Sequence, residues 1–455
     1  MKRRNFIHQV ILTSGALMAG KQCMNPREDA STTAPEEESQ LASEKIPTPS
    51  TNAAYIQEPA REISVVSTAD VVVVGGGPAG VTAAIAASRA GASTLLVERY
   101  NHLGGLWTGG LVLPLLSTHG KARNKEQLRT LHGIGYEIYE RLRDLDMTVS
   151  EVNPVIDPEA GKYVLELMLK ESGARVFYHS WASSVIMNGN AIEAVILETK
   201  SGRVAVRPKM VVDCTGDGDV LSWAGEDFLN MPYEIGLVHR LGNVDRVNRD
   251  APGYQELYLG DKTPLPSVNW VNMTGGEHEN GLDFKRLSEL QREHRLEIWD
   301  QVQKIRATPG HEEVFLLDTA PQQGVRMSRI LDGMYRLTLK DSMTYRTFKD
   351  SIGLSGAWTS VLYEGKRYET RDRPVWQIPF RSLVPKRIHN LLVAGRCFSF
   401  EEALFQDARI IGTCLITGHA AGAGAALAAG SGTSIRDLDY KKVQELLKKQ
   451  HAQLS

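Results

Sequence analysis

The chain has 455 residues, of which 42% are apolar and 23% are charged, and its formal net charge is −2 at pH 7. This composition is typical of a globular protein long enough to build two lobes around a sizeable core. A charge so near zero gives no electrostatic reason to expect nucleic acid or an anionic membrane surface as a partner. The four cysteines form no CxxC pair, which argues against a zinc ribbon and a thioredoxin-like pair, and no metal site is predicted. Their scattered spacing also gives no support for an iron–sulfur cluster.

Residues 1–23 have the features of an export signal. Arg3 and Arg4 precede a short apolar region that is too short to span a bilayer, and this order resembles a twin-arginine leader. We therefore expect an exported, periplasmic protein, the alternative being a disordered basic N-terminus on a cytoplasmic one. Cys23 could carry a lipid anchor, although the residues before it fit a lipobox poorly. Residues 24–60 are rich in Pro, Ser, Thr, Ala and Glu, which predicts a disordered linker, and no later stretch reads as a transmembrane segment.

A glycine-rich loop follows the first strongly apolar segment. Four valines at 71–74 predict a strand buried on both faces, and the strand leads into Gly75-x-Gly77-x-x-Gly80. An alanine-rich helix over 81–90 comes next, and a second apolar strand over 94–97 ends at Glu98. Strand, loop, helix and strand in this order are the elements of a nucleotide-binding βαβ unit.

Each residue type in this loop has a physical role in dinucleotide binding. Gly75 allows the tight turn, Gly77 lets the backbone approach a pyrophosphate, and Gly80 lets the helix pack closely on the strand. The helix N-terminus offers free N–H groups and a partial positive charge to the phosphates. Glu98 stands where a carboxylate accepts hydrogen bonds from ribose hydroxyls. The alternative is an ordinary βαβ turn in an α/β domain that binds no nucleotide.

The next segments extend the same lobe. The loop 102–110 holds four glycines, including Gly104 and Gly105, and we expect it to contact the cofactor. Helices are predicted over 128–145 and 159–170. Strands are predicted over 175–180, 183–188, 191–199 and 203–207, and tight turns join the last three into an antiparallel meander. An apolar strand at 210–213 then ends in a loop of small and acidic residues.

The chain from about 226 to 384 differs in character, with most of the tryptophans and many charges, and we interpret it as a substrate or cap domain. Arg326, Arg329 and Arg381 lie beside apolar strand residues there, where they could bind an anionic substrate or close structural ion pairs. A buried strand over 390–394 brings the chain back. A small-residue helix over 409–427 and a surface helix over 437–454 follow it. The domains predicted are thus 61–225 and 385–455, two parts of one nucleotide-binding lobe, with 226–384 inserted between them.

The segments 70–110, 211–219 and 390–429 together resemble the FAD-dependent oxidoreductase family, and the stretches 324–329 and 378–383 match it as well. Members have a glutathione-reductase-like FAD domain and are often grouped with heterodisulfide-reductase-A-like flavoproteins. The resemblance implies an α/β fold, a Rossmann-like FAD-binding domain with an inserted α+β substrate or cap domain, and FAD as cofactor. The cluster cysteines of heterodisulfide reductases have no counterparts here, and no second GxGxxG indicates an NAD(P)H domain.

The resemblance also implies roles for particular positions. Gly75, Gly77 and Gly80, with Pro78 and Ala79 between them, would hold the FAD pyrophosphate, and Glu98, followed by Arg99, would hold the adenosine ribose. Gly104 and Gly105 would lie near the pyrophosphate or the flavin, and Thr215, Gly216 and Asp217 would approach the adenine-side half. Gly395 and Arg396 would close over the ribityl chain, and Gly412 and Thr413 would face the flavin edge. Gly412 and Thr413 open the last long helix, whose dipole would stabilise an anionic reduced flavin.

The function predicted is hydride transfer from a small organic substrate to the flavin, with the electrons passed to an external acceptor such as oxygen, a quinone or a protein. One alternative is a flavin electron-transfer subunit of a heterodisulfide-reductase-A-like complex, and another is a non-catalytic exported nucleotide-binding protein. No catalytic residue is assigned. The candidates for a base or a substrate-binding group are His419, Glu401, Arg326, His102, His119 and His239.

Overall fold

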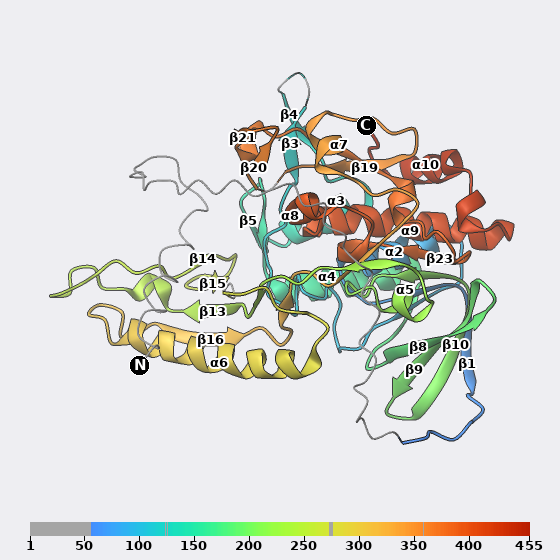
Figure 1. Cartoon of the computed structure of the whole chain (residues 1–455). Helices are drawn as coiled ribbons and strands as arrows, with labels where there is room; N and C mark the ends of the chain where they lie inside the picture. The colour runs from blue at the N-terminus through green and yellow to red at the C-terminus, as the bar shows by residue number, and fades with distance from the viewer. Residues whose placement is uncertain (1–55, 123, 125, 273–275, 358) are drawn as a thin grey trace. The chain divides into compact units, whose positions relative to one another are not determined.

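One seven-stranded sheet, which combines a parallel layer with an antiparallel meander, carries the glycine-rich loop. Part of it is labelled at the lower right of Figure 1. The computed structural model describes residues 56–455 except 123, 125, 273–275 and 358, and within them 56–255 and 259–455 cluster into one unit. The predicted export signal and nearly all of the predicted linker lie outside the described residues. The strands of the central sheet are β7 (Arg175–Phe177), β2 (Thr94–Val97), β1 (Val65–Val74), β10 (Gly202–Asp213), β9 (Ala191–Thr199), β8 (Trp181–Asn188) and β23 (Leu391–Val393).

The order of these strands is that of a nucleotide-binding sheet with a meander attached. β7, β2, β1 and β10 pair in parallel, and β23 adds in parallel to the C-terminal half of β10. The N-terminal half of β10 pairs antiparallel with β9, which pairs antiparallel with β8. The two strands predicted at 203–207 and 210–213 are therefore one continuous strand. β1 pairs with it in parallel from Ala205 to Asp213, and β9 and β23 pair with its first and last residues.

The valines of β1 face two separate cores. Val71 and Val73 belong to the core that lies between the sheet and helices α2 and α9, whereas Val72 and Val74 belong to the core on the other face. All four side chains are buried, with at most 3% of their surface exposed. An apolar residue on both faces is what a central parallel strand requires, so the run of valines predicted this strand correctly.

Two helices cover one face of the sheet in close contact with each other. α2 (Pro78–Arg89) lies against α9 (Ile411–Ser431), and Figure 1 shows the two side by side. A Cβ at Gly418 or Gly422 of α9 would overlap the backbone of α2 at Ala79 or Ala83. These glycines therefore set the short separation of the two helices. Of the described helices, only α9 is long and apolar enough to cross a membrane, and 89% of its most apolar window is buried in the core.

The region 226–384 contributes a second sheet of four antiparallel strands. Its order is β14 (Asp261–Lys262), β15 (Asn269–Val271), β13 (His239–Gly242) and β16 (Phe315–Thr319). The long helix α6 (Phe284–Arg306) packs along β16, as Figure 1 shows. Ile298 and Val302 of α6 join Trp270 and Leu241 in the core beneath this sheet.

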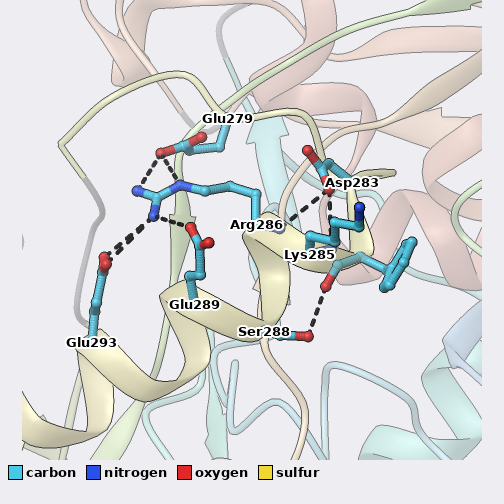
Figure 2. A network of polar contacts seen from close by, with 8 residues as sticks. Glu279, Asp283, Lys285, Arg286, Ser288, Glu289 and Glu293 are labelled. Atoms are coloured by element: carbon cyan, nitrogen blue, oxygen red, sulfur yellow. Dashed lines mark hydrogen bonds and ion pairs between the residues drawn. The ribbon is translucent and has the colours of Figure 1, made fainter. Parts of the chain in front are cut away.

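The start of α6 carries a surface network of charges, drawn in Figure 2. The Asp283 carboxylate caps the helix by accepting hydrogen bonds from the backbone N–H groups of residues 285 and 286. The Arg286 guanidinium lies among three carboxylates, 2.9 Å from Glu279, 3.2 Å from Glu289 and 3.5 Å from Glu293. This arginine is therefore surrounded by more negative charge than it carries.

The remaining elements are short or peripheral. The strands are β3 (His119–Lys121), β4 (Gln127–Arg129), β5 (Thr148–Val149), β6 (Val155–Ile156), β11 (Phe228–Asn230), β12 (Ile235–Gly236), β17 (Gly324–Val325), β18 (Arg329–Leu331), β19 (Ser351–Ser355), β20 (Val361–Tyr363), β21 (Lys366–Tyr368) and β22 (Trp376–Pro379). The helices are α3 (Gly133–Asp144), α4 (Pro158–Ser172), α5 (Asp219–Trp223), α7 (Leu339–Met343), α8 (Phe405–Ala408) and α10 (Tyr440–Lys449). The 3₁₀ turns are η1 (Val244–Arg246), η2 (Thr370–Asp372), η3 (Phe380–Leu383), η4 (Gly395–Cys397), η5 (Glu402–Leu404) and η6 (Ile435–Asp437).

The helix predictions differ from the structure mainly at their ends. The helix predicted over 128–145 begins at Gly133, because residues 127–129 pair with β3 as β4. The helix predicted over 437–454 covers only Tyr440–Lys449, capped by the Asp439 carboxylate. The predicted helix at 159–170 corresponds to α4, which ends at a left-handed Gly173.

Candidate functional site

The loop between β1 and α2 has the geometry that the glycine spacing predicted. Gly75 has a φ of +99°, and a Cβ there would meet the Cys214 carbonyl carbon at 2.8 Å. A Cβ at Gly80 would overlap the carbonyl of Gly75 across the turn. Both positions therefore exclude any side chain, because the loop is pressed against the end of β10 and against itself.

Gly77 differs from the other two glycines of the motif. Its backbone is extended, with φ −69°, and an added Cβ would have no atom within 4 Å. The space in front of Gly77 is thus free of protein atoms, and α2 starts there with Pro78 and Ala79 and without a side-chain cap. An uncapped helix start facing open space is an anion site of the type that holds a pyrophosphate. The chain fits a bound dinucleotide at this point.

The Glu98 carboxylate lies directly behind the loop. It is 5% exposed, and its two oxygens accept hydrogen bonds from the backbone N–H groups of Gly76 (2.6 Å) and Tyr100 (2.8 Å). A carboxylate has about four acceptor positions, so lone pairs remain for ribose hydroxyls. Arg99, the next residue, points elsewhere: its guanidinium lies over the rings of Tyr100 and Trp181.

The second glycine-rich loop packs on the first. The Gly104 N–H donates to the Gly76 carbonyl at 2.8 Å, and a Cβ on Gly105 would lie 3.0 Å from the Cα of Gly77. Gly104 and Gly105 both have positive φ, +102° and +50°. The loop over 102–110 therefore borders the open space at Gly77, and its contact with the cofactor stays a prediction.

A network of acidic and basic groups joins the loop after β10 to η4. The Asp217 carboxylate accepts hydrogen bonds from Arg396 (2.9 Å) and from the Ser328 hydroxyl (2.7 Å). Burial raises the pKa of Asp217, but the Arg396 guanidinium and this hydroxyl outweigh it and hold the pKa below its ordinary value. Gly216, at φ +78°, packs against the same guanidinium. The Arg396 Nη1 is buried and has no hydrogen-bond partner in the described protein, so it is free to donate to a ligand.

The Thr215 hydroxyl organises this loop. Its hydroxyl donates to Asp213 at 2.7 Å and accepts from the backbone N–H of Asp219 at 3.0 Å. Burial, followed by repulsion from the neighbouring carboxylates Asp217 and Asp213, raises the pKa of Asp219 to about 6. Arg329 compensates part of this charge at 2.9 Å.

The start of α9 is the second helix N-terminus of the site. Gly412 and Thr413 lie in its first turn, and no side chain caps it. The Thr413 hydroxyl is held by Ser355 (2.8 Å) and by the Asp407 carbonyl (3.1 Å). Gly395, with φ +80°, donates its N–H to the Thr417 hydroxyl one turn further along α9. This network fixes the turn before Arg396 onto the helix.

The three arginines singled out from the sequence have different surroundings. Arg329 and Arg381 are paired with carboxylates, Arg329 with Asp219 at 2.9 Å and Arg381 with Asp350 at 2.9 Å. Among the ion pairs of the described chain, the carboxylate nearest to Arg326 is that of Glu234, at 4.0 Å. Burial lowers the pKa of Arg326. Structural pairing therefore accounts for two of the three, whereas Arg326 donates to the backbone carbonyl of Glu234 at 3.2 Å.

A fourth arginine, which the sequence analysis did not single out, lies close to Arg326. Arg409 is bound by the side-chain oxygen of Gln406 at 2.5 Å, and its Nε is buried without a partner. Burial, followed by repulsion from Arg326, lowers the pKa of Arg409 to about 10. No local sequence motif marks Arg409. Its distinguishing feature is that no carboxylate pairs with it in the described structure, which its sequence neighbours do not reveal.

The candidate bases are held by neighbours inside the protein. His419 lies 2.7 Å from the Gln450 side chain, and burial lowers its pKa to about 4. His102 contacts Asn101 and Gln322 through its two ring nitrogens at 2.9 and 3.1 Å. This geometry favours structural roles for both.

The other candidates do not form one constellation either. Burial lowers the pKa of His239 to about 4, and burial also lowers that of His119, whose ring contacts the Thr118 hydroxyl at 3.1 Å. The Glu401 carboxylate accepts a hydrogen bond from the backbone N–H of Leu339 at the start of α7. None of the six sequence-predicted candidates is thereby assigned a catalytic role.

The cysteines lie nearer to one another than the sequence indicates. Cys214, Cys397 and Cys414 are all buried free thiols. Burial, followed by the charge of Asp213 and then the two other thiols, raises the pKa of Cys214 well above its ordinary value. Within the part of the chain that the structure describes, no group of three or more His, Cys, Asp or Glu side chains is arranged to hold a metal ion.

The parallel sheet, the glycine loop at the end of β1 and the acid at the end of β2 define a Rossmann-type dinucleotide-binding protein. The chain belongs to the FAD dependent oxidoreductase family, whose model it matches over residues 70–240 and 239–447. This match confirms the predicted family and fold class, and it places the chain among enzymes of the flavin oxidoreductase type with FAD as the family's cofactor.

Named relatives share about half of their length with the chain. It is 30% identical over 221 residues to a digeranylgeranylglycerophospholipid reductase of Picrophilus torridus, covering 46% of this chain and 54% of that one. It is 29% identical over 168 residues to a thiamine thiazole synthase of Aeropyrum pernix, covering 34% of this chain and 56% of that one. A solved structure of a geranylgeranyl bacteriochlorophyll reductase-like protein from Thermoplasma acidophilum aligns with a TM-score of 0.42 at 17% identity, covering 84% and 83% of the two chains.

Proposed function

We propose that this protein is an FAD-dependent oxidoreductase that takes a hydride from a small organic substrate and passes the electrons to an external acceptor. The observation that carries the proposal is the open space at Gly77, bordered by the uncapped start of α2 and by the loop at Gly104, with the Glu98 carboxylate behind it. Each of these features is a requirement of dinucleotide binding, and they come from separate segments.

The residues divide the work of holding the cofactor. Backbone N–H groups at the start of α2 bind the phosphates, and Glu98 accepts from the ribose hydroxyls. Arg396 offers a buried, unpartnered Nη1 donor next to the fixed turn at Gly395. The start of α9, which no side chain caps, would offer its N–H groups to the flavin end of the cofactor. FAD, when bound, supplies the two-electron carrier for the reaction.

A pair of glycine variants tests cofactor binding. Gly77→Leu and Gly430→Leu each add a side chain to a glycine that has no atom within 4 Å of the added Cβ, so neither clashes with the protein. We expect wild type and Gly430→Leu to release FAD on denaturation and Gly77→Leu to lose it, with unchanged circular dichroism. Wild-type protein without FAD, or equal FAD content in both variants, would overturn the proposal.

Anaerobic reduction separates the proposed reaction from its alternatives. An oxidoreductase with its own substrate is bleached by one member of a panel of small alcohols, amines and organic acids. An electron-transfer subunit is bleached only by a partner protein. A non-catalytic nucleotide-binding protein retains an oxidised flavin with every donor. Product formation under air, with a quinone or with a carrier protein then identifies the acceptor.

We further propose export through the twin-arginine-like signal at residues 1–23. The support is the adjacent pair Arg3-Arg4 ahead of a short apolar region, and this route suits a protein that carries a cofactor. Replacing both arginines by lysine in the full chain should leave the protein in the cytoplasm, whereas Cys23→Ala tests a lipid anchor separately. Unchanged export of the double variant would contradict the signal assignment.

A further inference from the structure

The region around Arg409 contains more positive than negative charge. Three other arginines of the interior have a carboxylate at hydrogen-bond distance: Arg396 with Asp217, Arg329 with Asp219 and Arg373 with Asp407, at 2.9, 2.9 and 2.5 Å. Arg409 has none among the described residues. Its neighbour Arg326 has only the Glu234 carboxylate, at 4.0 Å. A guanidinium buried without a counter-charge is costly, so its retention calls for a ligand that supplies the charge.

Arg409 and Arg326 are joined by a continuous chain of contacts. The Arg409 guanidinium donates to Gln406 at 2.5 Å, and the Gln406 amide donates to the Tyr233 hydroxyl at 3.0 Å. Arg326 donates to the backbone carbonyl of Glu234, the residue after Tyr233, at 3.2 Å. One arginine thus comes from the nucleotide-binding lobe and the other from the inserted region, and both are held in place by neutral groups.

Three aromatic rings form a row that begins beside Arg409. The Tyr233 ring is 4.5 Å from the ring of Phe405 and 4.7 Å from that of His278, measured between centroids. The Arg409 guanidinium lies over the Phe405 ring at 5.7 Å. Positive charge next to a planar apolar surface is suited to a molecule that has an anionic group on an aromatic or other flat apolar body.

Arg409 also lies at the start of α9. Arg409 immediately precedes Ile410, the N-cap of that helix, and its carbonyl accepts from the Cys414 thiol at 3.5 Å. A group bound by Arg409 would therefore lie close to the first turn of α9, where Gly412 and Thr413 are expected to face the flavin. This position is that of a substrate rather than of the phosphates, which belong to the start of α2.

We propose that Arg409 and Arg326 bind the carboxylate of the substrate, and that Tyr233, His278 and Phe405 contact its apolar body. The proposed function then acts on a small organic acid with a flat apolar body, and the inference rests on that function. Gln406 is a positioning residue, because it holds Arg409 and Tyr233 in register. The arginines stay protonated and transfer no proton in this assignment; they orient the acid and neutralise its charge.

Ligand binding to the FAD-loaded full chain tests the assignment without knowledge of the substrate. Benzoate and acetate serve as probes, with benzamide as the neutral counterpart of benzoate, and binding is measured by calorimetry and by the change in flavin absorbance. We expect benzoate to bind more tightly than acetate and benzamide not to bind. Arg409→Gln and Arg326→Gln should each weaken benzoate binding by about tenfold or more, since a hydrogen bond to a charged group is lost.

Arg286→Gln is the matched control, because it removes the same charge from the surface network of Figure 2 and should leave benzoate binding unchanged. Arg409→Lys, which restores the charge but not the fork of donors, should recover part of the affinity. FAD content is measured in every variant, and we expect it to be unchanged.

Three outcomes would overturn the assignment. The first is the absence of saturable benzoate and acetate binding in the millimolar range. The second is benzoate affinity that is equal in wild type, Arg409→Gln and Arg326→Gln. The third is loss of FAD from Arg409→Gln, which would assign that arginine to the cofactor. Wild-type protein without FAD is a failure of the proposed function instead, and calorimetry with benzoate then still decides whether the arginines bind an acid.

Discussion

Two arginines, Arg286 at the start of α6 and Arg409 before α9, have opposite electrostatic surroundings. Arg286 lies on the surface within reach of three carboxylates, and Figure 2 shows all three converging on its guanidinium. Arg409, whose guanidinium Nε is buried, lies beside a second arginine and has no carboxylate partner in the described chain. The pKa of Arg286 is raised, first by its hydrogen bond to Glu279, and the pKa of Arg409 is lowered to about 10, first by burial.

The comparison separates charges that serve the fold from charges held for a ligand. On the surface, excess carboxylates contribute little each, because water already screens the charge. In the interior the same imbalance costs free energy, since an unpaired buried charge has lost its hydration. A guanidinium that remains charged and unpaired there is therefore the better candidate for binding an anion, although Arg286 has more ionic contacts.

The largest effect is expected where a buried arginine is paired. Arg373 is 1% exposed and lies 2.5 Å from the Asp407 carboxylate. Asp407→Asn removes the negative partner and leaves the guanidinium buried, so we expect the free energy of unfolding to fall by about 3–5 kcal/mol. Urea denaturation measures this loss. If Asp407→Asn cost no more than a surface substitution, pairing would not distinguish Arg373 from Arg409.

Histidine offers a different solution to burial, namely loss of the charge. The pKa of His419 is about 4 in the folded protein, against 6.5 for the ordinary group. The unfolded chain therefore binds a proton that the folded chain does not, and the stability present above pH 6.5 is lost as the pH falls toward 4. The protonation of His419 accounts for up to about 3 kcal/mol of this loss in the free energy of unfolding. The loss, measured by unfolding at a series of pH values, should be smaller in His419→Gln.

Much of the fold follows from local sequence patterns. The four valines, the three glycines and the acid at Glu98 predicted β1, the loop and the end of β2, because each of these features depends on residues close in the chain. Arg409 was not predicted, since its environment is set by residues far away in sequence, such as Tyr233 and Arg326. Likewise the pairing of Arg381 with Asp350 joins residues 31 positions apart and gives no local signal.

The region of Arg409 should become more stable when its charge is removed. Arg409→Met keeps much of the side-chain volume and eliminates the uncompensated guanidinium, so we expect the free energy of unfolding to rise by about 1–2 kcal/mol. The folded-state pKa lies below the unfolded value, so the penalty is complete below pH 10 and decreases above it. The gain of the variant should therefore be constant from pH 7 to 9. A loss of stability in Arg409→Met would indicate that the side chain serves the fold.

The smallest effect is expected at the surface network. Glu289→Gln leaves Arg286 with two carboxylates, Glu279 and Glu293, at 2.9 and 3.5 Å. The remaining pairs take up the charge, and exposed pairs are worth about 0–1 kcal/mol each, so the change in unfolding free energy should be below about 0.5 kcal/mol and shrink further in salt. A double-mutant cycle with Arg286→Gln measures the coupling directly. If the coupling energy between Glu289 and Arg286 exceeded the stability lost in Asp407→Asn, the surface ion pair would contribute more than the buried one. That result would contradict the comparison.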